Sequence, residues 1–228
     1  MEIAQTADHA LRILLSVSDD GPQTVNELCE RLGLARSVAR RLVATLQHRS
    51  FVKVDGGQVS VGPAILSIAA KALPEVYREA QPLLDEFARD LGETVVVTVL
   101  EGKDAVVAAL ATSDRHPLKV EYPLGFRHPV ATGAAGRAIL FDLPPKKAEA
   151  LISATGDVET IERFREERAA GYALSHDELK LGAFGIAVPI RIAQREGSLS
   201  IVAPASRGDG LFDHLGRLRE VATRLCEI

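Results

Sequence analysis

The sequence of 228 residues contains only two cysteines, Cys29 and Cys226, which lie far apart within helical patterns. No Cys-x-x-Cys pair occurs and the six histidines are scattered, so neither a disulfide framework nor a metal site is expected. Apolar runs such as Val95–Leu100 are far too short to span a bilayer, and the N-terminus carries Glu2 and no apolar signal core. We therefore expect a soluble, cytoplasmic protein that does not enter a membrane.

Motifs of common catalytic sites are also missing. The sequence has no Gly-x-Ser-x-Gly elbow, no Gly-x-x-x-x-Gly-Lys-Ser/Thr loop and no His-Glu-x-x-His motif. Asp177 and Glu178 are adjacent carboxylates, but neighbours on a chain point apart, and we interpret them as an exposed cap before the next strand. Ser200 has no histidine at a suggestive position. We expect neither catalysis nor a cofactor.

Charge is low overall but unevenly distributed. The chain has a formal net charge of −4 and a pI of about 5.9, which argues against a bulk nucleic-acid binder. The segment from Arg31 to Val54 differs, because it has no Asp or Glu and contains six bases: Arg31, Arg36, Arg40, Arg41, Arg49 and Lys53. A local basic surface on an acidic protein is typical of a specific DNA contact, although arginines on a helix face can also be merely solvated.

Two helices are predicted in this region. Thr24 and Glu27 have the spacing of a capping box, and the helix that they start ends at Gly33, which can adopt the left-handed conformation. The second helix has an apolar face formed by Val38, Leu42, Val43 and Leu46. Its opposite face is polar and is predicted to enter the major groove of DNA: Arg36, Ser37, Arg40 and Arg41.

A two-stranded wing is predicted to follow the second helix. Strands Val52–Val54 and Gln58–Val61 are joined by Asp55-Gly56-Gly57, a strong hairpin signal. Helix, turn, helix and wing in this order predict a winged helix-turn-helix, which we interpret as a DNA-reading domain. Three further residues are assigned to its DNA-binding surface, the last two of them to phosphates or the minor groove: Thr24, Lys53 and Gln58.

The predicted DNA-binding domain covers residues 1–62 and is followed by a linker helix over residues 63–74, which Pro63 opens and Pro74 ends or kinks. The linker is rich in Ala, Leu and Ile, and its surplus apolar surface can pack on a partner subunit or on the chain's own second domain. The core of the first domain is expected to be closed by a helix from Ala4 to Val17, through apolar residues at helical spacing: Ala7, Ala10, Leu11, Leu14 and Leu15.

Residues 75–228 predict an α+β domain, with strands in the middle and helices at both ends. A helix over Glu75–Leu91 precedes a hairpin of Thr94–Leu100 and Ala105–Ala111, and a third strand is expected at Leu118–Tyr122. The remaining predicted elements are a short helix over 131–141, helices from Pro144-Pro145 and over Val158–Ala170, strands Ile186–Ile192 and Ser198–Ala203 joined by a turn ending at Gly197, and a final helix from about Leu211 to Cys226.

Several strings in this order resemble the IclR family of bacterial transcription regulators. They are QTADHALRILL, GLARSVARRLVATL, FVKVDGGQVSVGP, GETVVVTVL, PVATGAAGRAIL, GYALSHDEL, LGAFGIAVPI and LSIVAPASR. No single string is highly specific, but together they keep the family's order over essentially the whole chain. The resemblance implies a winged helix-turn-helix, a linker helix, and a GAF-like C-terminal domain over residues 75–228 that binds a small effector. It also implies dimers or tetramers that bind palindromic operators.

The resemblance further implies where the effector binds. The turn into the ATGAAGRA helix offers the backbone amides of Ala134, Ala135 and Gly136 to an anionic ligand. Three further positions of this sequence correspond to the family's effector pocket: Ser175, Gly185 and Ser200. Ala131, Arg137 and Val202 replace the family's usual histidine, lysine and serine, which predicts a larger, less polar cavity for a small organic acid, including an aromatic one. The alternative is a GAF-like protein that binds or converts a small molecule without regulating DNA.

Overall fold

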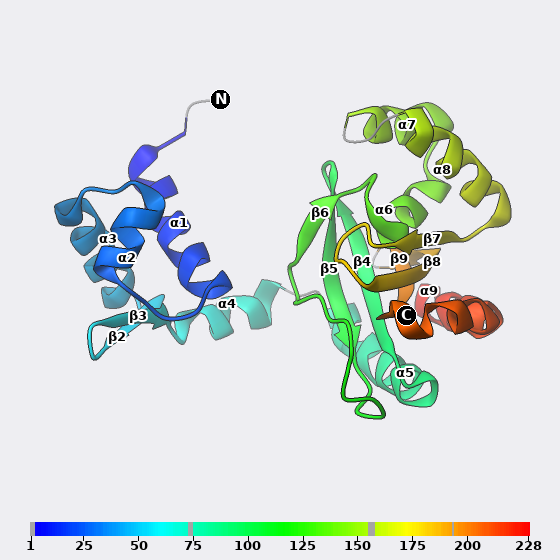
Figure 1. Ribbon diagram of the computed structural model, residues 1–228, viewed down its shortest axis with the longest axis horizontal. Helices are drawn as coiled ribbons and strands as arrows, with labels where there is room; N and C mark the ends of the chain where they lie inside the picture. Colours follow the sequence, from blue (N-terminus) through cyan, green and yellow to red (C-terminus); the bar gives the residue numbers. More distant parts are fainter. Residues whose placement is uncertain (1–2, 73–74, 155–157, 193) are drawn as a thin grey trace. The chain divides into compact units, whose positions relative to one another are not determined.

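The computed structural model describes residues 3–72, 75–154, 158–192 and 194–228. The chain divides into two compact units, residues 1–73 and 74–228. Leu73 and Pro74, where the linker helix is predicted to end, lie outside the described residues. The first unit, coloured blue to cyan in Figure 1, contains α1 (Gln5–Asp19), β1 (Gln23–Thr24), α2 (Val25–Leu32), α3 (Arg36–His48), β2 (Val52–Asp55), β3 (Gln58–Val61) and α4 (Ala64–Ala72).

The predicted start and end of α2 are confirmed. The Glu27 amide donates to Thr24 Oγ1 at 3.3 Å, and the Thr24 amide donates to Glu27 Oε2 at 2.6 Å, which completes the capping box. Helix α2 ends at Gly33 in the left-handed conformation, with φ of 67°. These hydrogen bonds from Thr24 hold the pKa of Glu27 below its ordinary value.

Only part of the predicted inner face of α1 contributes to the core of the first unit, since Ala10 and Leu14 pack against it as predicted. Ile13 and Val17 are buried, whereas Leu11 and Leu15 are 58% and 59% exposed. Helix α1 carries more leucines than one stripe of a helix can bury, so apolar spacing alone did not identify the inner face. The prediction that Leu11 and Leu15 help to close the core was therefore wrong.

The wing has a third strand that the sequence did not reveal. The two-residue strand β1 pairs antiparallel with β3, so Thr24 lies opposite Gln58. Gln23 is buried and its side-chain amide donates to the Ser16 carbonyl at 2.8 Å, which fixes β1 against α1. A strand of two residues is too short to show the alternating pattern by which strands are recognised.

The second unit is an α+β domain built on one antiparallel sheet with the order β6-β5-β4-β9-β8-β7. Its helices are α5 (Glu75–Leu91), α6 (Gly133–Ile139), α7 (Pro145–Ser153), α8 (Val158–Ala170) and α9 (Leu215–Cys226), with 3-10 turns at Leu140–Asp142 and Ala205–His214. Its strands are β4 (Thr94–Glu101), β5 (Asp104–Ala111), β6 (Arg127–Pro129), β7 (Ala173–His176), β8 (Ala183–Ile192) and β9 (Arg195–Pro204).

Helices cover both faces of this sheet. Helix α6 packs across β7, β8 and β9 on one face, while α5 and α9 pack on the other (Figure 1). Gly136 makes the α6 contact possible, because a Cβ added there would lie 2.4 Å from the Val130 carbonyl oxygen. Helix α6 is therefore held unusually close to the chain segment that leads into it.

The third strand of the sheet was predicted at the wrong place. Residues 118–122 have no strand pairing, and β6 takes the edge position beside β5 instead. Val120 is buried and Tyr122 packs beside it over the sheet. The alternating apolar residues of this segment are therefore explained by burial of their side chains and not by hydrogen bonds to a neighbouring strand. Pro117 and Pro123 flank the segment and lack the amide hydrogen that a ladder needs.

The hairpin of β8 and β9 is longer than predicted. Gly197 lies inside β9, opposite Ile190 and Val99, and not at the end of a turn. A Cβ at this position would lie 2.8 Å from the Thr98 carbonyl oxygen, so the glycine permits two strands to approach closely. Strand β7, which was not predicted, extends the sheet beyond β8.

The capping box provides a test of the first unit. We expect Thr24→Ala to destabilise the start of α2 by about 1 kcal/mol, because the substitution removes the hydroxyl that accepts from Glu27. Hydrogen exchange of the α2 amides should become about fivefold faster. Thr45→Ala is the matched control, since the exposed Thr45 hydroxyl bonds only within its own helix to Arg41. Equal exchange in both variants would contradict the assigned cap.

Candidate functional site

The polar face of α3 is as predicted from the sequence. Ala39, Leu42 and Val43 are buried on the inner side of the helix. The four residues assigned to the major groove are all exposed and share the outer side: Arg36, Ser37, Arg40 and Arg41. The spacing of these positions along the helix therefore produces one continuous polar surface.

The positive charge on this surface is available to a ligand. Arg31 is paired with Asp20 at 2.7 Å. Within the described part of the chain, no ion pair involves Arg36, Arg40 or Arg41. Guanidinium groups without a protein partner can bind phosphates or base edges without first breaking a salt bridge.

The wing contributes a weaker surface. Lys53 and Gln58 are exposed, and the register places Gln58 between Thr24 of β1 and Asp55 of β2. Asp55 is exposed and lies two positions after Lys53 on β2, so both side chains are on the same face and their charges offset each other. The Thr24 hydroxyl is already engaged by Glu27 at 2.8 Å. The strongest candidate for contact with DNA is therefore α3.

The second candidate site is a cavity in the second unit, between α6 and the sheet. Its floor is formed by residues of the strands: Val96, Thr98, Val107, Gly185, Ser200 and Val202. Helix α6 contributes Ala134 and Ala135. The remaining wall comes from segments outside the central strands, with these residues: Tyr122, Phe126, His128, Glu178 and Leu179.

The structure brings five of the six residues assigned to the effector together in this cavity: Ala134, Ala135, Ser175, Gly185 and Ser200. Gly136 does not reach the cavity, because it faces Val130. A Cβ at Gly185 would lie 2.8 Å from Ser175 Oγ, so the absent side chain leaves space for that hydroxyl. Ser200 Oγ donates to the Val96 carbonyl at 3.3 Å.

The cavity is smaller than the sequence suggested. Its free volume is about 30 Å³, whereas one water needs roughly 10–15 Å³ and a cavity of about 150 Å³ holds benzene. The aromatic side chains of Tyr122, Phe126 and Phe184 occupy space that the small residues of the floor leave open. An aromatic ligand would enter only after side chains of the loop wall move.

His128 is an uncharged polar group of the wall. Burial lowers its pKa, and hydrogen bonds to the backbone of Pro129 and Thr132 oppose this only in part. Its Nδ1 lies 3.1 Å from the Pro129 carbonyl oxygen. The imidazole is therefore neutral at pH 7 and gives the wall a polar group without a charge.

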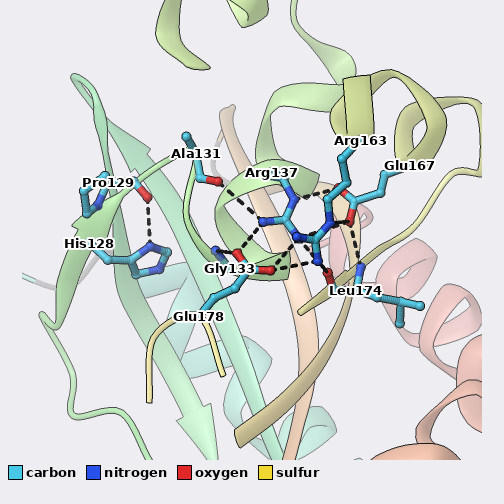
Figure 2. A network of polar contacts seen from close by, with 9 residues as sticks. All are labelled: His128, Pro129, Ala131, Gly133, Arg137, Arg163, Glu167, Leu174 and Glu178. Atoms are coloured by element: carbon cyan, nitrogen blue, oxygen red, sulfur yellow. Dashed lines mark hydrogen bonds and ion pairs between the residues drawn. The ribbon is translucent and has the colours of Figure 1, made fainter. Parts of the chain in front are cut away.

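A buried ionic network lies behind the cavity (Figure 2). The side chain of Arg137 is only 1% exposed and donates to Glu167 Oε2 at 2.7 Å and to Glu178 Oε2 at 2.6 Å. It also donates to the Leu174 carbonyl at 2.6 Å. The network joins α6, α8, β7 and the segment after β7. The sequence alone did not reveal this network. Its visible sign is an arginine in a helix rich in glycine and alanine, followed later by the charged helix α8.

Glu178 also caps α6. The Gly133 amide, the first of the helix, donates to Glu178 Oε2 at 2.7 Å. Burial alone would raise the pKa of Glu178, but the hydrogen bonds and charge of Arg137, with Gly133 and Arg163, outweigh it, so the pKa lies below its ordinary value. Our interpretation of Asp177 and Glu178 as an exposed cap was therefore wrong for Glu178, which is paired and largely buried.

Neither a metal site nor a membrane span is found in the described segments. Among those residues, no group of three or more His, Cys, Asp or Glu side chains could hold a metal ion. None of their helices is both long and apolar enough to cross a bilayer.

Comparisons with known proteins identify the family of both units. The family model for the C-terminal domain of the bacterial transcriptional regulator IclR matches residues 70–227, and the IclR helix-turn-helix model matches residues 6–56. The HTH-type transcriptional regulator TtgV of Pseudomonas putida is 28% identical over 197 residues, which cover 82% of this chain and 76% of that protein.

Solved structures give the same result for the fold. The crystal structure of an IclR transcriptional regulator from Alicyclobacillus acidocaldarius is 25% identical, with a TM-score of 0.80 over 99% of both chains. An IclR homologue from Microbacterium hydrocarbonoxydans, complexed with 4-hydroxybenzoate, is 23% identical, with a TM-score of 0.74 over 96% of this chain and 97% of that one. The chain therefore belongs to the IclR family of DNA-binding transcriptional regulators, which are not enzymes.

Proposed function

We propose that this protein binds a palindromic DNA operator through α3 and the wing, and that a small organic molecule in the cavity of the second unit changes its affinity for that operator. The observation that carries the proposal is the exposed face of α3, with Arg36, Arg40 and Arg41 free of ion pairs within the described residues. In this geometry Arg40 and Arg41 read base edges, while Lys53 and Gln58 contact phosphates or the minor groove.

The effector site proposed is the cavity floor with the first turn of α6. Ala134, Ala135, Ser175, Gly185 and Ser200 all line it. The family resemblance implies a small organic acid, and the 4-hydroxybenzoate complexed with the regulator from Microbacterium hydrocarbonoxydans is an aromatic acid. Two classes of effector, acids and uncharged molecules, are compatible with the apolar floor once the loop wall moves.

A dimer or tetramer is proposed from the linker helix. Leu66 and Ile68 of α4 are 75% and 50% exposed, so this helix leaves large apolar side chains uncovered on two sides. A palindromic site needs two readers related by two-fold symmetry. Burial of these side chains against a second copy would supply both the apolar contact and the second reader.

The recognition surface is tested by single substitutions. We expect Arg40→Ala or Arg41→Ala to cost about 1–3 kcal/mol of operator binding and to relax preference at one base position, because each removes a base contact. Lys53→Ala should weaken binding to all DNA sequences similarly, and it should lower the slope of the logarithm of the binding constant against the logarithm of salt concentration by about one. Fluorescence anisotropy with DNA from upstream of the gene gives both quantities. Arg165→Ala, in the second unit, is the control and should bind as the parent does.

Parent-like binding by both Arg40→Ala and Arg41→Ala would show that a different face contacts DNA. Equal losses on every sequence would place the two arginines on phosphates and not on bases.

The effector cavity is tested at Gly185. A leucine there fills the floor beside Ser175, so Gly185→Leu should abolish the thermal stabilisation given by ligands and leave operator binding without ligand intact. The measurement is a thermal-shift screen of small organic compounds, charged and uncharged. Gly216→Leu makes the same change where an added Cβ meets nothing within 4 Å, and it should respond to ligand as the parent does. A normal ligand response in folded Gly185→Leu would place the effector elsewhere.

The oligomer is tested by light scattering. The intact protein should have at least twice the chain mass of 24.5 kDa at micromolar concentration. The double variant Leu66→Glu, Ile68→Glu should shift towards the monomer, because it places charges on the surface proposed to be buried. A parent protein that is monomeric at these concentrations would remove the proposal.

A further inference from the structure

Resting on the proposed effector site, we infer that the cavity selects an uncharged organic molecule with a hydrogen-bonding group, and that Glu178 is the residue that excludes carboxylates. The inference concerns the class of effector, and it reverses the expectation of an organic acid. Four observations carry it: the position of Glu178, its saturation with donors, the absence of a free cation in the wall, and the polar groups that remain.

Part of the helix start at which an effector carboxylate would bind is already filled by the protein. Glu178 Oε2 accepts from the Gly133 amide at 2.7 Å, so the first free N–H of α6 has an anionic partner within the chain. The neighbouring Leu179 covers the same turn, because a Cβ added to Gly133 would lie 2.9 Å from its Cδ1. Both Glu178 and Leu179 line the cavity. The helix start therefore presents a carboxylate and a leucine to the ligand.

The charge of Glu178 is satisfied from behind. Oε2 accepts from Gly133 and from Arg137 Nη1 at 2.6 Å, and Oε1 accepts from Arg137 Nη2 at 3.1 Å and lies 2.9 Å from Arg163 Nη2 (Figure 2). A carboxylate has about four acceptor positions, and four donors occupy them here. Glu178 therefore needs no cationic ligand, and it has no free acceptor with which to recruit one.

A ligand carboxylate would find no counter-charge in the cavity. The described lining includes neither arginine nor lysine, and the guanidiniums of Arg137 and Arg163 are paired with Glu178 and do not line the cavity. His128 is held neutral by its burial. An entering anion would lose its water beside a carboxylate and would find no free cation, which is unfavourable in a site of low dielectric constant.

An uncharged ligand meets a more suitable surface. Val96, Val107 and Val202 offer apolar contact, while the hydroxyl of Ser175 and the imidazole of His128 can each form a hydrogen bond. Ser200 already donates to the Val96 carbonyl, so its oxygen is left to accept. An amide or alcohol group can satisfy these partners without placing a charge near Glu178.

The test compares two pairs of probes that have nearly the same shape and differ in charge: benzamide with benzoate, and acetamide with acetate. Thermal shifts of the intact protein at pH 7 give the apparent affinity of each, and anisotropy gives the effect of each on operator binding. We expect the amide of at least one pair to bind at least about tenfold more tightly than its acid. The smaller pair is included because the cavity has only about 30 Å³ of free volume.

Glu178→Gln separates the role of the charge from that of the shape. The variant removes the negative charge from the wall and leaves Arg137 and Arg163 less neutralised, so benzoate or acetate should gain at least about tenfold in affinity. The amides should change little. Glu167→Gln is the matched control, because it removes the same charge from Arg137 at a position that does not line the cavity. It should keep the parent's preference for amides.

Parent protein that binds the acids more tightly than the amides would overturn this inference and leave the proposed effector site standing. The same holds if Glu178→Gln and Glu167→Gln change the preference equally. Parent protein that none of the four probes stabilises would overturn both the inference and the effector part of the proposed function. If Glu178→Gln does not fold, the affinities of the parent protein for the amides and for the acids still test the inference.

Discussion

The second unit depends on the buried guanidinium of Arg137. A charge in this position is costly unless it is fully paired, and here its five N–H groups meet Glu167, Glu178 and the carbonyls of Ala131 and Leu174. Removing one partner of such a group typically costs about 3–5 kcal/mol, because the charge that remains is left uncompensated. The arginine thereby fixes α6 against α8 and β7, and it places Glu178 where α6 begins.

The ionic network around Arg137 also determines which charged and polar groups face the cavity. Because Arg137 draws Glu178 to the Gly133 amide, the helix dipole of α6 is neutralised inside the protein and is not offered to a ligand. The same pairing keeps Glu178 ionised, since the pKa of this carboxylate is lowered. The floor of the cavity, with Gly185, Ser200 and the valines, is left as a neutral surface. The same two side chains therefore hold the network together and carry the ligand preference that we propose.

The sequence predicted those features that depend on neighbours along the chain. The capping box at Thr24, the end of α2 at Gly33, the outer face of α3 and the hairpin of β4 and β5 follow from local spacing and turn chemistry, and the structure contains each of them. The predicted α+β fold of the second unit is likewise present in the structure. The predicted family is shown by the two family models.

The missed features depend on contacts between distant residues. Gly133 and Glu178 are 45 positions apart, and nothing local shows that one donates to the other. Leu11 and Leu15 have the right spacing for burial but lie on the outer side of α1, and Val120 alternates like a strand residue without pairing as one. Gly136 shows the reverse case, in which a residue expected beside a ligand instead permits α6 to approach Val130. That contact fixes one wall of the cavity against backbone, and Gly197 fixes the floor in the same way, so neither can be rebuilt by exchanging a side chain. The loops that carry Tyr122, Phe126 and Leu179 have no such backbone contact, so substitutions in them can change the shape of the cavity without disturbing the sheet.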